Sequence, residues 1–127
     1  MKNLEGLSAE DFQAIYAVNV IGAYQLSRAF TPLLQAPPGG AIVNISSVAS
    51  IMGRGSSLAC MDSKGALNAL TVGLARALGP AIRVNAIAPG LVESPWLMAG
   101  LGEALDAAQA AQAALRHRRI GRHDRTR

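Results

Sequence analysis

The sequence predicts an α/β fold with parallel strands, and the alternation of two kinds of segment leads to this prediction. Residues 41–45 and 82–88 are short apolar runs, the first with the composition of a strand buried in a parallel sheet. Residues 9–34 and 59–78 place apolar residues at helical spacing. Such alternation is typical of parallel strands joined by right-handed crossovers. At 127 residues the chain is one domain at most.

The first helical segment begins at a capping signal. Ser8 with Asp11 three positions later is the pattern of a capping box, so we expect a helix from Ala9. Asn19 lies within its apolar stripe, and a buried amide without partners would cost about 1–3 kcal/mol. Spacing alone favours an asparagine that bonds locally and bends the helix. The stripe predicted to be buried consists of Phe12, Ile15, Tyr16, Gly22, Ala23, Leu26, Phe30 and Leu33.

The first strand follows a turn and leads into two serines. Residues 37–40 read Pro-Pro-Gly-Gly, which ends the helical region because proline lacks a backbone donor. Ser46 and Ser47 come directly after the apolar run 41–45, at the end of the strand where open α/β sheets bind ligands. The alternative for both serines is ordinary turn chemistry, in which their hydroxyls cap backbone groups.

The second helical segment carries two polar residues of interest. Positions 60, 64, 67, 71, 74 and 78 are expected to share one face, so Cys60 and Lys64 are stacked one turn apart. A lone lysine on a helix is usually a solvated surface residue, and spacing does not distinguish that alternative. After the second strand, Pro89 and Gly90 by themselves predict only a turn.

The net charge of +4 belongs to the end of the chain. Residues 116–127 contain six arginines and one aspartate, a net charge of +5, so residues 1–115 carry −1. An arginine run of this kind binds phosphates in some proteins, but a solvated, disordered tail is the better interpretation. We therefore expect a folded region over residues 1–115, a basic tail over 116–127, and no nucleic-acid partner.

Other classes of protein are not supported by the sequence. No apolar run approaches the roughly 20 residues of a membrane helix, and the N-terminus has no secretory signal pattern. The single cysteine excludes an internal disulfide and gives no metal-ligand pattern. A cytoplasmic location without a membrane partner or a metal is the expectation.

Three segments carry a specific resemblance. Residues 44–48 read Asn-Ile-Ser-Ser-Val, residues 60–67 read Cys-Met-Asp-Ser-Lys-Gly-Ala-Leu, and residues 83–90 read Arg-Val-Asn-Ala-Ile-Ala-Pro-Gly. Together with Val-Asn-Val at 18–20, they resemble the catalytic half of a short-chain dehydrogenase/reductase, over roughly residues 8–100. The resemblance implies part of a Rossmann-like, doubly wound parallel sheet. The glycine-rich cofactor motif that opens such a sheet is not found, so we expect the sheet to be truncated.

The resemblance assigns roles to four positions. In this family a serine, a tyrosine and a lysine exchange the proton that accompanies hydride transfer, and an asparagine holds a water in the proton relay. The matching residues here are Ser47, Lys64 and Asn19, while the position of the tyrosine, four residues before the lysine, holds Cys60. Ser47 would then bind the substrate oxygen, and Ser46 would support the loop.

The exchange of tyrosine for cysteine has a chemical consequence. An ammonium one helical turn away, with a cationic nicotinamide, lowers the phenol pKa from about 10 toward neutrality. A thiol has an ordinary pKa of about 8.5, but its side chain is too short to reach the place of the phenol oxygen, and proton transfer needs hydrogen-bond reach. We expect Cys60 to be a small, mostly inert core residue, and neither Tyr16 nor Tyr24 to replace the phenol.

The resemblance also implies a cofactor, NAD or NADP. Lys64 would bind the nicotinamide ribose, and Pro89, Gly90 and Val92 would lie along the nicotinamide. Ser94 stands where the family usually has a threonine that bonds the carboxamide or a phosphate.

Two functions follow from the sequence. The first is an NAD(P)-dependent oxidoreductase acting on a small carbonyl/alcohol substrate, impaired or inactive in this chain. The second is a noncatalytic module that pairs with itself or with a related subunit through helices 9–34 and 59–78, as family members do. Residues 95–98, Pro-Trp-Leu-Met, resemble the start of a substrate lid, or pack under a loop.

Overall fold

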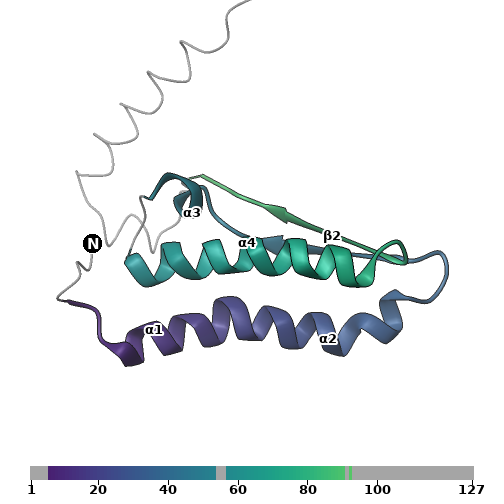
Figure 1. Cartoon of the computed structure of the whole chain (residues 1–127), viewed down its shortest axis with the longest axis horizontal. Coiled ribbons are helices and arrows are strands. Elements are labelled where there is room, and N and C mark those ends of the chain that lie inside the picture. The colour runs from purple at the N-terminus through teal and green to yellow at the C-terminus, as the bar shows by residue number, and fades with distance from the viewer. Residues whose placement is uncertain (1–5, 54–56, 91, 93–127) are drawn as a thin grey trace, which may run out of the picture. The chain divides into compact units, whose positions relative to one another are not determined.

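The computed structural model describes residues 6–53, 57–90 and 92 (Figure 1). All of these except Val92 belong to one compact unit, residues 1–90. Their order in the chain is helix, strand, helices and strand. The elements are α1 (Ala9–Tyr16), η2 (Ala17–Gly22), α2 (Ala23–Leu34), β1 (Gly40–Ile45), α3 (Ala49–Met52), α4 (Leu58–Leu78) and β2 (Ile82–Ile87).

The first helical segment begins as predicted and changes its winding in the middle. Ser8 Oγ accepts from the Asp11 amide at 3.1 Å, and the Asp11 carboxylate accepts from the Ser8 amide at 3.2 Å, so the capping box is confirmed. The segment from Ala17 to Gly22 is wound as a π-helix, which places Asn19 in a widened turn. Such turns are rare and frequently lie at functional sites.

The two strands form a parallel sheet, as predicted. Gly40 pairs with Ile82 and Ile45 with Ile87, in continuous register. Helix α4 makes the connection between the strands, and residues 79–81 turn the chain into β2. At the corresponding turn before β1, Gly39 has φ +92°, and a Cβ there would lie 2.8 Å from the Ala81 carbonyl oxygen. Only glycine fits this position, because both the conformation and the space exclude a side chain.

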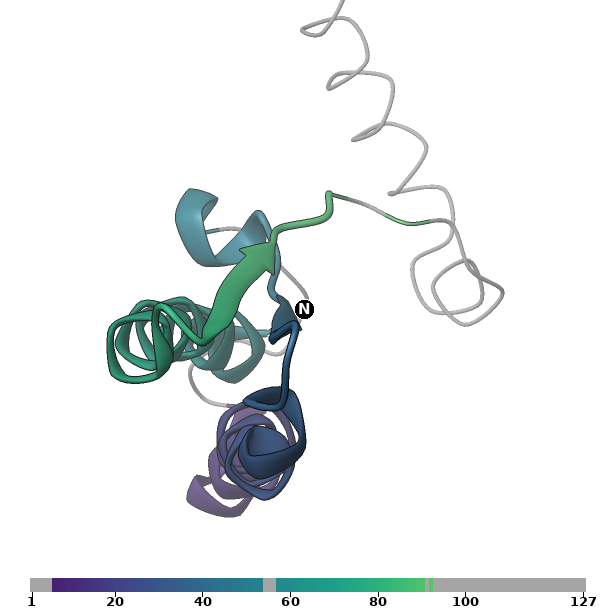
Figure 2. The same cartoon turned by 90° about the vertical axis from the view of Figure 1, so that its right-hand side faces the viewer.

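The helices pack against the strands and against each other. Helix α4 contacts β2, α1 and η2, while α2 contacts β1. Figure 2 shows α4 beside the strands and the α1–α2 segment beside α4. The link between β1 and α4 is partly polar, because Asn44 donates to Thr71 Oγ1 at 2.9 Å and both residues are buried. A buried amide is stable there because it has a partner.

The core of the described residues is small. The buried apolar side chains are Ala59, Leu67, Ile82 and Val84. The buried face of α4 runs through Ala59, Ser63, Leu67 and Thr71. The predicted face shares Leu67 and Thr71 with it, but in the first two turns the buried residues are Ala59 and Ser63 and not Cys60 and Lys64. Cys60 itself is half-buried, so the prediction that it is a core residue is wrong.

The apolar stripe predicted to be buried along residues 9–34 is exposed in its second half, so that part of the prediction is wrong. Phe12, Ile15 and Tyr16 are half-buried. In α2, however, Leu26 is 61% exposed, Phe30 51% and Leu33 71%. The physical reason is that no described segment covers this flank of α2, so the amphipathic pattern is present without anything packed on it.

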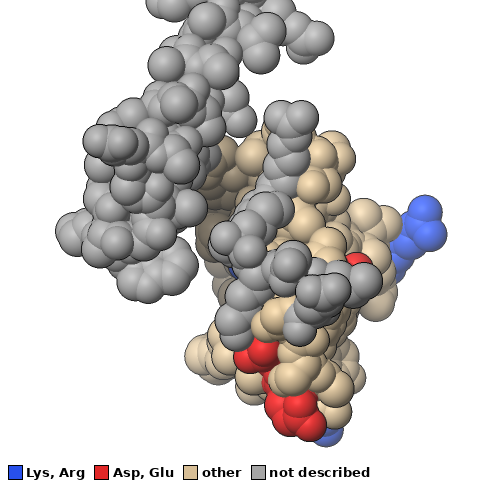
Figure 3. Space-filling model, turned by 90° about the vertical axis from the view of Figure 1, so that its left-hand side faces the viewer, with Lys and Arg blue, Asp and Glu red and all other residues tan. Residues whose placement is uncertain are grey.

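The described surface carries few charges. Figure 3, from the side where α1 begins, shows a mostly uncharged described surface, with acidic side chains gathered near one end and isolated basic side chains at its margins. Among the described residues, no helix is long and apolar enough to cross a membrane.

Candidate functional site

The candidate residues lie where the two parallel strands end. Ser46 and Ser47 follow β1, and Pro89 and Gly90 follow β2. The two segments are joined beyond the strands, because the Ser46 amide donates to the Ile87 carbonyl at 2.8 Å and the Val48 amide to the Pro89 carbonyl at 3.1 Å. The carboxyl edge of the sheet thus brings together residues that are about 40 positions apart in the chain, as expected for a ligand site in a parallel sheet.

The two serines have different environments. Ser46 is 4% exposed, and its hydroxyl donates to the Lys64 carbonyl at 3.2 Å, so it fastens the loop to α4. Ser47 is half-buried, and its Oγ accepts from the Ala49 amide at 3.1 Å. The Ser47 hydroxyl therefore performs the turn chemistry that its position allows. Within the described residues it donates to no acceptor, so its proton is available to a ligand.

The loop after Ser47 is held by a second serine. Ser50 Oγ donates to the Ser47 carbonyl at 2.6 Å and accepts from Asn68 Nδ2 of α4 at 2.9 Å. These bonds fix the backbone of Ser47 against α4. Such support keeps the Ser47 hydroxyl in one orientation.

Lys64 reaches the same edge of the sheet. Its ammonium donates to the Ile45 carbonyl, at the last residue of β1, with a distance of 2.7 Å. Lys64 is half-buried, so it is not an ordinary solvated lysine. An ammonium has three donors, and this bond leaves two of them for other oxygen atoms.

Cys60 lies in the first turn of α4. The N-cap of this helix is Ser57, whose Oγ accepts from the Cys60 amide at 3.2 Å. The thiol is therefore one helical turn from Lys64, as the spacing predicted.

Asn19 bonds to α4 and not to its own helix. Its Nδ2 donates to Ser63 Oγ at 2.9 Å, and Ser63 Oγ donates to the Cys60 carbonyl at 2.9 Å. Ser63 is completely buried. The π-helical turn and the turn of α4 between Cys60 and Lys64 are thus joined by side-chain hydrogen bonds. The alternative that spacing alone favoured, an asparagine that bonds within its own helix, is wrong, because Asn19 bonds a partner on the neighbouring helix.

Sequence reasoning missed Ser63. Its signal was its spacing of four residues from Ala59 and from Leu67, which places it on one face of the helix with them. A serine on such an apolar face needs a partner, and here the partner is Asn19.

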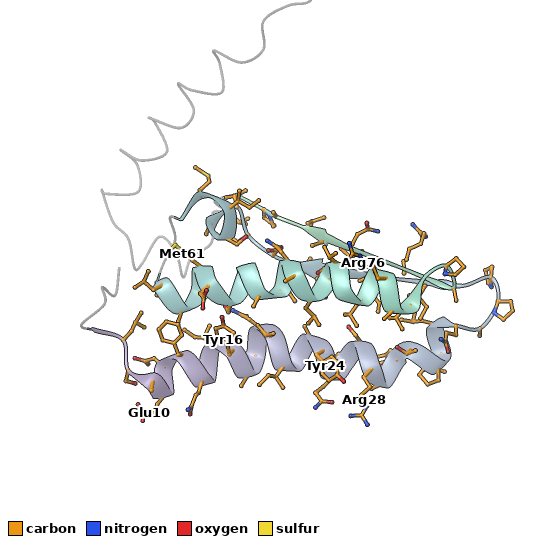
Figure 4. All side chains as sticks on the ribbon, viewed as in Figure 1. Glu10, Tyr16, Tyr24, Arg28, Met61 and Arg76 are labelled. Carbon is orange, nitrogen blue, oxygen red and sulfur yellow. The ribbon has the colours of Figure 1, made fainter. Side chains whose placement is uncertain are left out.

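Tyr16 does not replace the phenol that is absent at position 60. Its hydroxyl donates to the Asp62 carboxylate at 2.6 Å, between α1 and α4 (Figure 4). This hydrogen bond, with a smaller contribution from burial, raises the Tyr16 pKa above its ordinary value. A proton-exchanging phenol needs a lowered pKa, so Tyr16 is unsuited to that task. Tyr24 lies farther along, on α2, and is 43% exposed (Figure 4).

The remaining predicted positions are only partly described. Gly90 and Val92 are exposed. Ser94, the possible lid at 95–98 and the arginine-rich residues 116–127 lie outside the described residues. The structure therefore brings together Ser47, Lys64 and Pro89, and it links Asn19 to them through Ser63.

Comparison with known proteins shows to which family the chain belongs. A family model described as Enoyl-(Acyl carrier protein) reductase matches residues 1–126. The protein named "Short-chain dehydrogenase/reductase homolog YusR" from Bacillus subtilis is 45% identical over 75 residues, which cover 59% of this chain and 58% of that protein. The chain belongs to the short-chain dehydrogenase/reductase family.

Solved structures of this short-chain dehydrogenase/reductase type share the fold. A 3-oxoacyl-(acyl-carrier protein) reductase from Brucella melitensis has a TM-score of 0.76 and 33% identity, covering 85% of this chain and 41% of its own. A gluconate 5-dehydrogenase from Burkholderia cenocepacia, solved with NADP and tartrate, has a TM-score of 0.75 and 27% identity, covering 86% and 43%. The chain spans only 38% of the length of two other curated relatives. The described elements are thus part of a Rossmann-like fold.

Proposed function

We propose that this chain provides the substrate side and the proton relay of an NAD(P)-dependent oxidoreductase that acts on a small carbonyl/alcohol pair. One observation supports this most directly. The Lys64 ammonium is held 2.7 Å from the Ile45 carbonyl, two residues before Ser47, at the carboxyl edge of a parallel sheet. The family relationship supplies the reaction class.

Each residue has a distinct part in this proposal. Ser47 donates its free hydroxyl proton to the substrate oxygen. Lys64 uses its two remaining donors on the hydroxyls of the nicotinamide ribose. Asn19 is a positioning residue, which acts through Ser63 on the turn of α4 between Cys60 and Lys64. Together these groups orient a substrate and hold a proton path.

The residues fit only one side of a dinucleotide. The Lys64 donors and the exposed backbone at Gly90 suit the nicotinamide end, and we propose that Pro89, Gly90, Val92 and Ser94 line it. No glycine-rich turn for the pyrophosphate is present within residues 6–53 or 57–90. When bound, the cofactor would supply or accept the hydride.

Cys60 makes the proposed activity weak. Its thiol occupies the position from which the family phenol exchanges a proton. Because the thiol is shorter, it does not come within hydrogen-bond reach of the substrate oxygen held by Ser47. General acid–base catalysis typically contributes about 10²–10⁴-fold, so turnover should be lower by that amount.

The test is Cys60→Tyr in a chimera. The 127-residue chain is joined behind the part of the Brucella reductase that lies outside the matched region. NADPH consumption is followed with a panel of small ketones and 3-oxoacyl thioesters. We expect Cys60→Tyr to raise kcat by about 10²-fold or more. Cys60→Phe is the matched control, because it adds the ring without the hydroxyl, and it should give no gain. Equal rates for the tyrosine and phenylalanine variants would contradict the assigned roles.

A second candidate is a noncatalytic module that associates through its helices. The observation in its favour is exposed apolar surface on both helical segments: Val18 is 74% exposed, Ile21 53% and Leu58 39%. Sedimentation at several concentrations distinguishes the candidates. Self-association without nicotinamide binding would support the module, whereas a monomer that binds NADPH would exclude it.

We further propose a cytoplasmic location without a nucleic-acid partner. The two-part organisation with a fold over 1–115 and a basic tail over 116–127 also stays a prediction. Fractionation of cells that express the tagged chain and a DNA-binding assay at physiological salt test these proposals.

A further inference from the structure

The segment that links β1 to α3 is fastened to one face of α4 at three places. Lys64 Nζ donates to the Ile45 carbonyl at 2.7 Å, and the Ser46 hydroxyl donates to the Lys64 carbonyl at 3.2 Å. Asn68, one helical turn after Lys64, donates from Nδ2 to Ser50 Oγ at 2.9 Å. The first two bonds hold the end of the strand, and the third holds the beginning of α3.

The third of these bonds sets the direction of a hydroxyl proton. A side-chain amide nitrogen only donates, so Ser50 Oγ accepts from Asn68 and keeps its single proton for another group. That group is the Ser47 carbonyl, whose oxygen is 2.6 Å from Ser50 Oγ. An amide, a hydroxyl and a carbonyl thus form one chain of hydrogen bonds with a fixed direction, in which each bond strengthens the next.

Ser47 is held at both its backbone and its side-chain oxygen. Its carbonyl accepts from the Ser50 hydroxyl and also from the Ser50 amide at 3.2 Å, while its Oγ accepts from the Ala49 amide at 3.1 Å. All of these donors belong to the first turn of α3. The direction of the Ser47 hydroxyl therefore follows the orientation of α3.

Helix α3 is too short to keep this orientation by itself. It has four residues, Ala49–Met52, whereas isolated helices need about 12–15 residues to be even marginally stable. Its two large apolar side chains contribute little burial, because Ile51 is 75% exposed and Met52 54%. Asn68 is half-buried on α4, a helix of 21 residues, so its bond to Ser50 ties α3 to a rigid support.

We propose that Asn68 and Ser50 are positioning residues, which set the direction of the Ser47 hydroxyl relative to Lys64. Asn68 and Lys64 lie one turn apart, so one helix holds the ammonium directly and Ser47 through Ser50. A misplacement of about 1 Å can cost about 10²-fold in rate, so this placement matters for a substrate oxygen. The importance of the placement rests on the function proposed for Ser47 and Lys64.

The first experiment measures the orientation of Ser47 in the full 127-residue chain. Three-bond couplings between its Hα and Hβ protons, measured by nuclear magnetic resonance, give the populations of its χ1 rotamers. Ser50→Thr keeps the hydroxyl, and Ser50→Val has the same shape without it. We expect one dominant Ser47 rotamer in the unaltered chain and in Ser50→Thr, and couplings averaged over several rotamers in Ser50→Val. Ser50→Ala replaces Ser50→Val if circular dichroism shows that the valine variant does not fold.

Asn68→Ala removes the donor that directs the Ser50 proton. The Ser47 couplings should therefore change in the same sense as in Ser50→Val, by a smaller amount. In the Ser50→Val background, Asn68→Ala should have no further effect, because Asn68 acts through Ser50. Asn85→Ala is the matched control, since Asn85 is exposed on β2 and its side chain makes no hydrogen bond with the described residues. It should leave the Ser47 couplings unchanged.

The second experiment separates positioning from stability. It uses the chimera with the Brucella reductase that carries Cys60→Tyr. We expect Ser50→Val to lower kcat for small ketones by about tenfold or more, and Ser50→Thr to keep it. The Kd of NADPH should stay within about twofold in both variants, because Lys64 and its bond to the Ile45 carbonyl are unchanged. The concentration of sites is taken from the stoichiometry of NADPH binding, so a loss of folded protein does not imitate the fall in kcat.

Three results would overturn the proposal. They are equal Ser47 couplings in Ser50→Thr and Ser50→Val, a separate effect of Asn68→Ala in the Ser50→Val background, and an unchanged kcat for Ser50→Val in a chimera that Ser47→Ala slows. A chimera that Ser47→Ala does not slow would contradict the function proposed for Ser47. The couplings in the full chain would then still decide whether Asn68 and Ser50 orient its hydroxyl.

Discussion

The hydrogen bond between Asn19 and Ser63 offers the sharpest test of how the candidate site is held. Asn19 Nδ2 and Ser63 Oγ are 2.9 Å apart, and Ser63 also donates to the Cys60 carbonyl. Three variants form a double-mutant cycle: Asn19→Ala, Ser63→Ala and the pair together. The cycle isolates the free energy of the contact from the separate effects of each substitution.

The structure sets the expected magnitudes. Ser63→Ala leaves the half-buried Asn19 amide without its partner, which should lower the free energy of unfolding by about 1–2 kcal/mol. Asn19→Ala should cost less, about 0.5–1 kcal/mol, because Ser63 keeps its bond to the Cys60 carbonyl and alanine favours the helix. The free energy of unfolding of the double variant should be only slightly lower than that of Ser63→Ala. We therefore expect a coupling energy of about 0.5–1.5 kcal/mol.

Urea unfolding followed by far-ultraviolet circular dichroism measures these values. The midpoint should shift without a change in the slope, which would show that the native state keeps its compactness. The control cycle combines Asn19→Ala with Ser50→Ala, because Ser50 bonds Asn68 and not Asn19. In that cycle the changes in the free energy of unfolding of the two single variants should add up to that of the double variant within about 0.3–0.5 kcal/mol. Additivity of the Asn19 and Ser63 substitutions would refute the view that this bond fastens the π-helical turn to α4.

Two further predictions concern the backbone and pH. Gly39→Ala should destabilise the fold by about 1 kcal/mol or more, because φ is +92° and the Ala81 carbonyl oxygen is too near. Gly65→Ala should stabilise it by about 0.5–1 kcal/mol, because Gly65 is helical and no atom of the described residues lies within 4 Å of an added Cβ. Urea unfolding measures both effects. The raised Tyr16 pKa means that the folded state keeps the phenol proton above pH about 10, where the unfolded state loses it, so stability should fall as pH rises through that range. Absorbance titration should show that Asp62→Asn lowers the Tyr16 pKa toward its ordinary value, and an unchanged titration would contradict the assigned hydrogen bond.

Much of the local structure could be predicted from the sequence. The capping box at Ser8, the strand after Gly39 and the turn at Pro89 depend on neighbouring residues, and the structure confirms the helix start and both strands. The resemblance in the motifs around Ser47 and Lys64 predicted the family, which the comparisons confirm. These features depend on residues that are close together in the sequence, so they can be predicted without knowing the tertiary structure.

Contacts between distant elements could not be predicted in the same way. The sequence placed Asn19 on an apolar stripe but gave no sign of a partner on α4, 44 positions away. It placed Leu67 and Thr71 on the buried face of α4 correctly, but in the first two turns it chose Cys60 and Lys64, whereas Ala59 and Ser63 are the buried residues there. A shift of one residue turns a helix by about 100°, and only packing against another element fixes that rotation.

The sequence by itself determined the family, the parallel α/β class and the thiol in place of a phenol. The tertiary structure decided where Lys64 points, that the Ser47 hydroxyl donates to no acceptor among the described residues, and that the apolar flank of α2 and the edge of β1 line an open groove. The physical reason is that a sequence pattern shows which side chains are apolar, while their burial depends on what packs against them. On the flank of α2 that carries Leu26, Phe30 and Leu33, no described part of the chain packs.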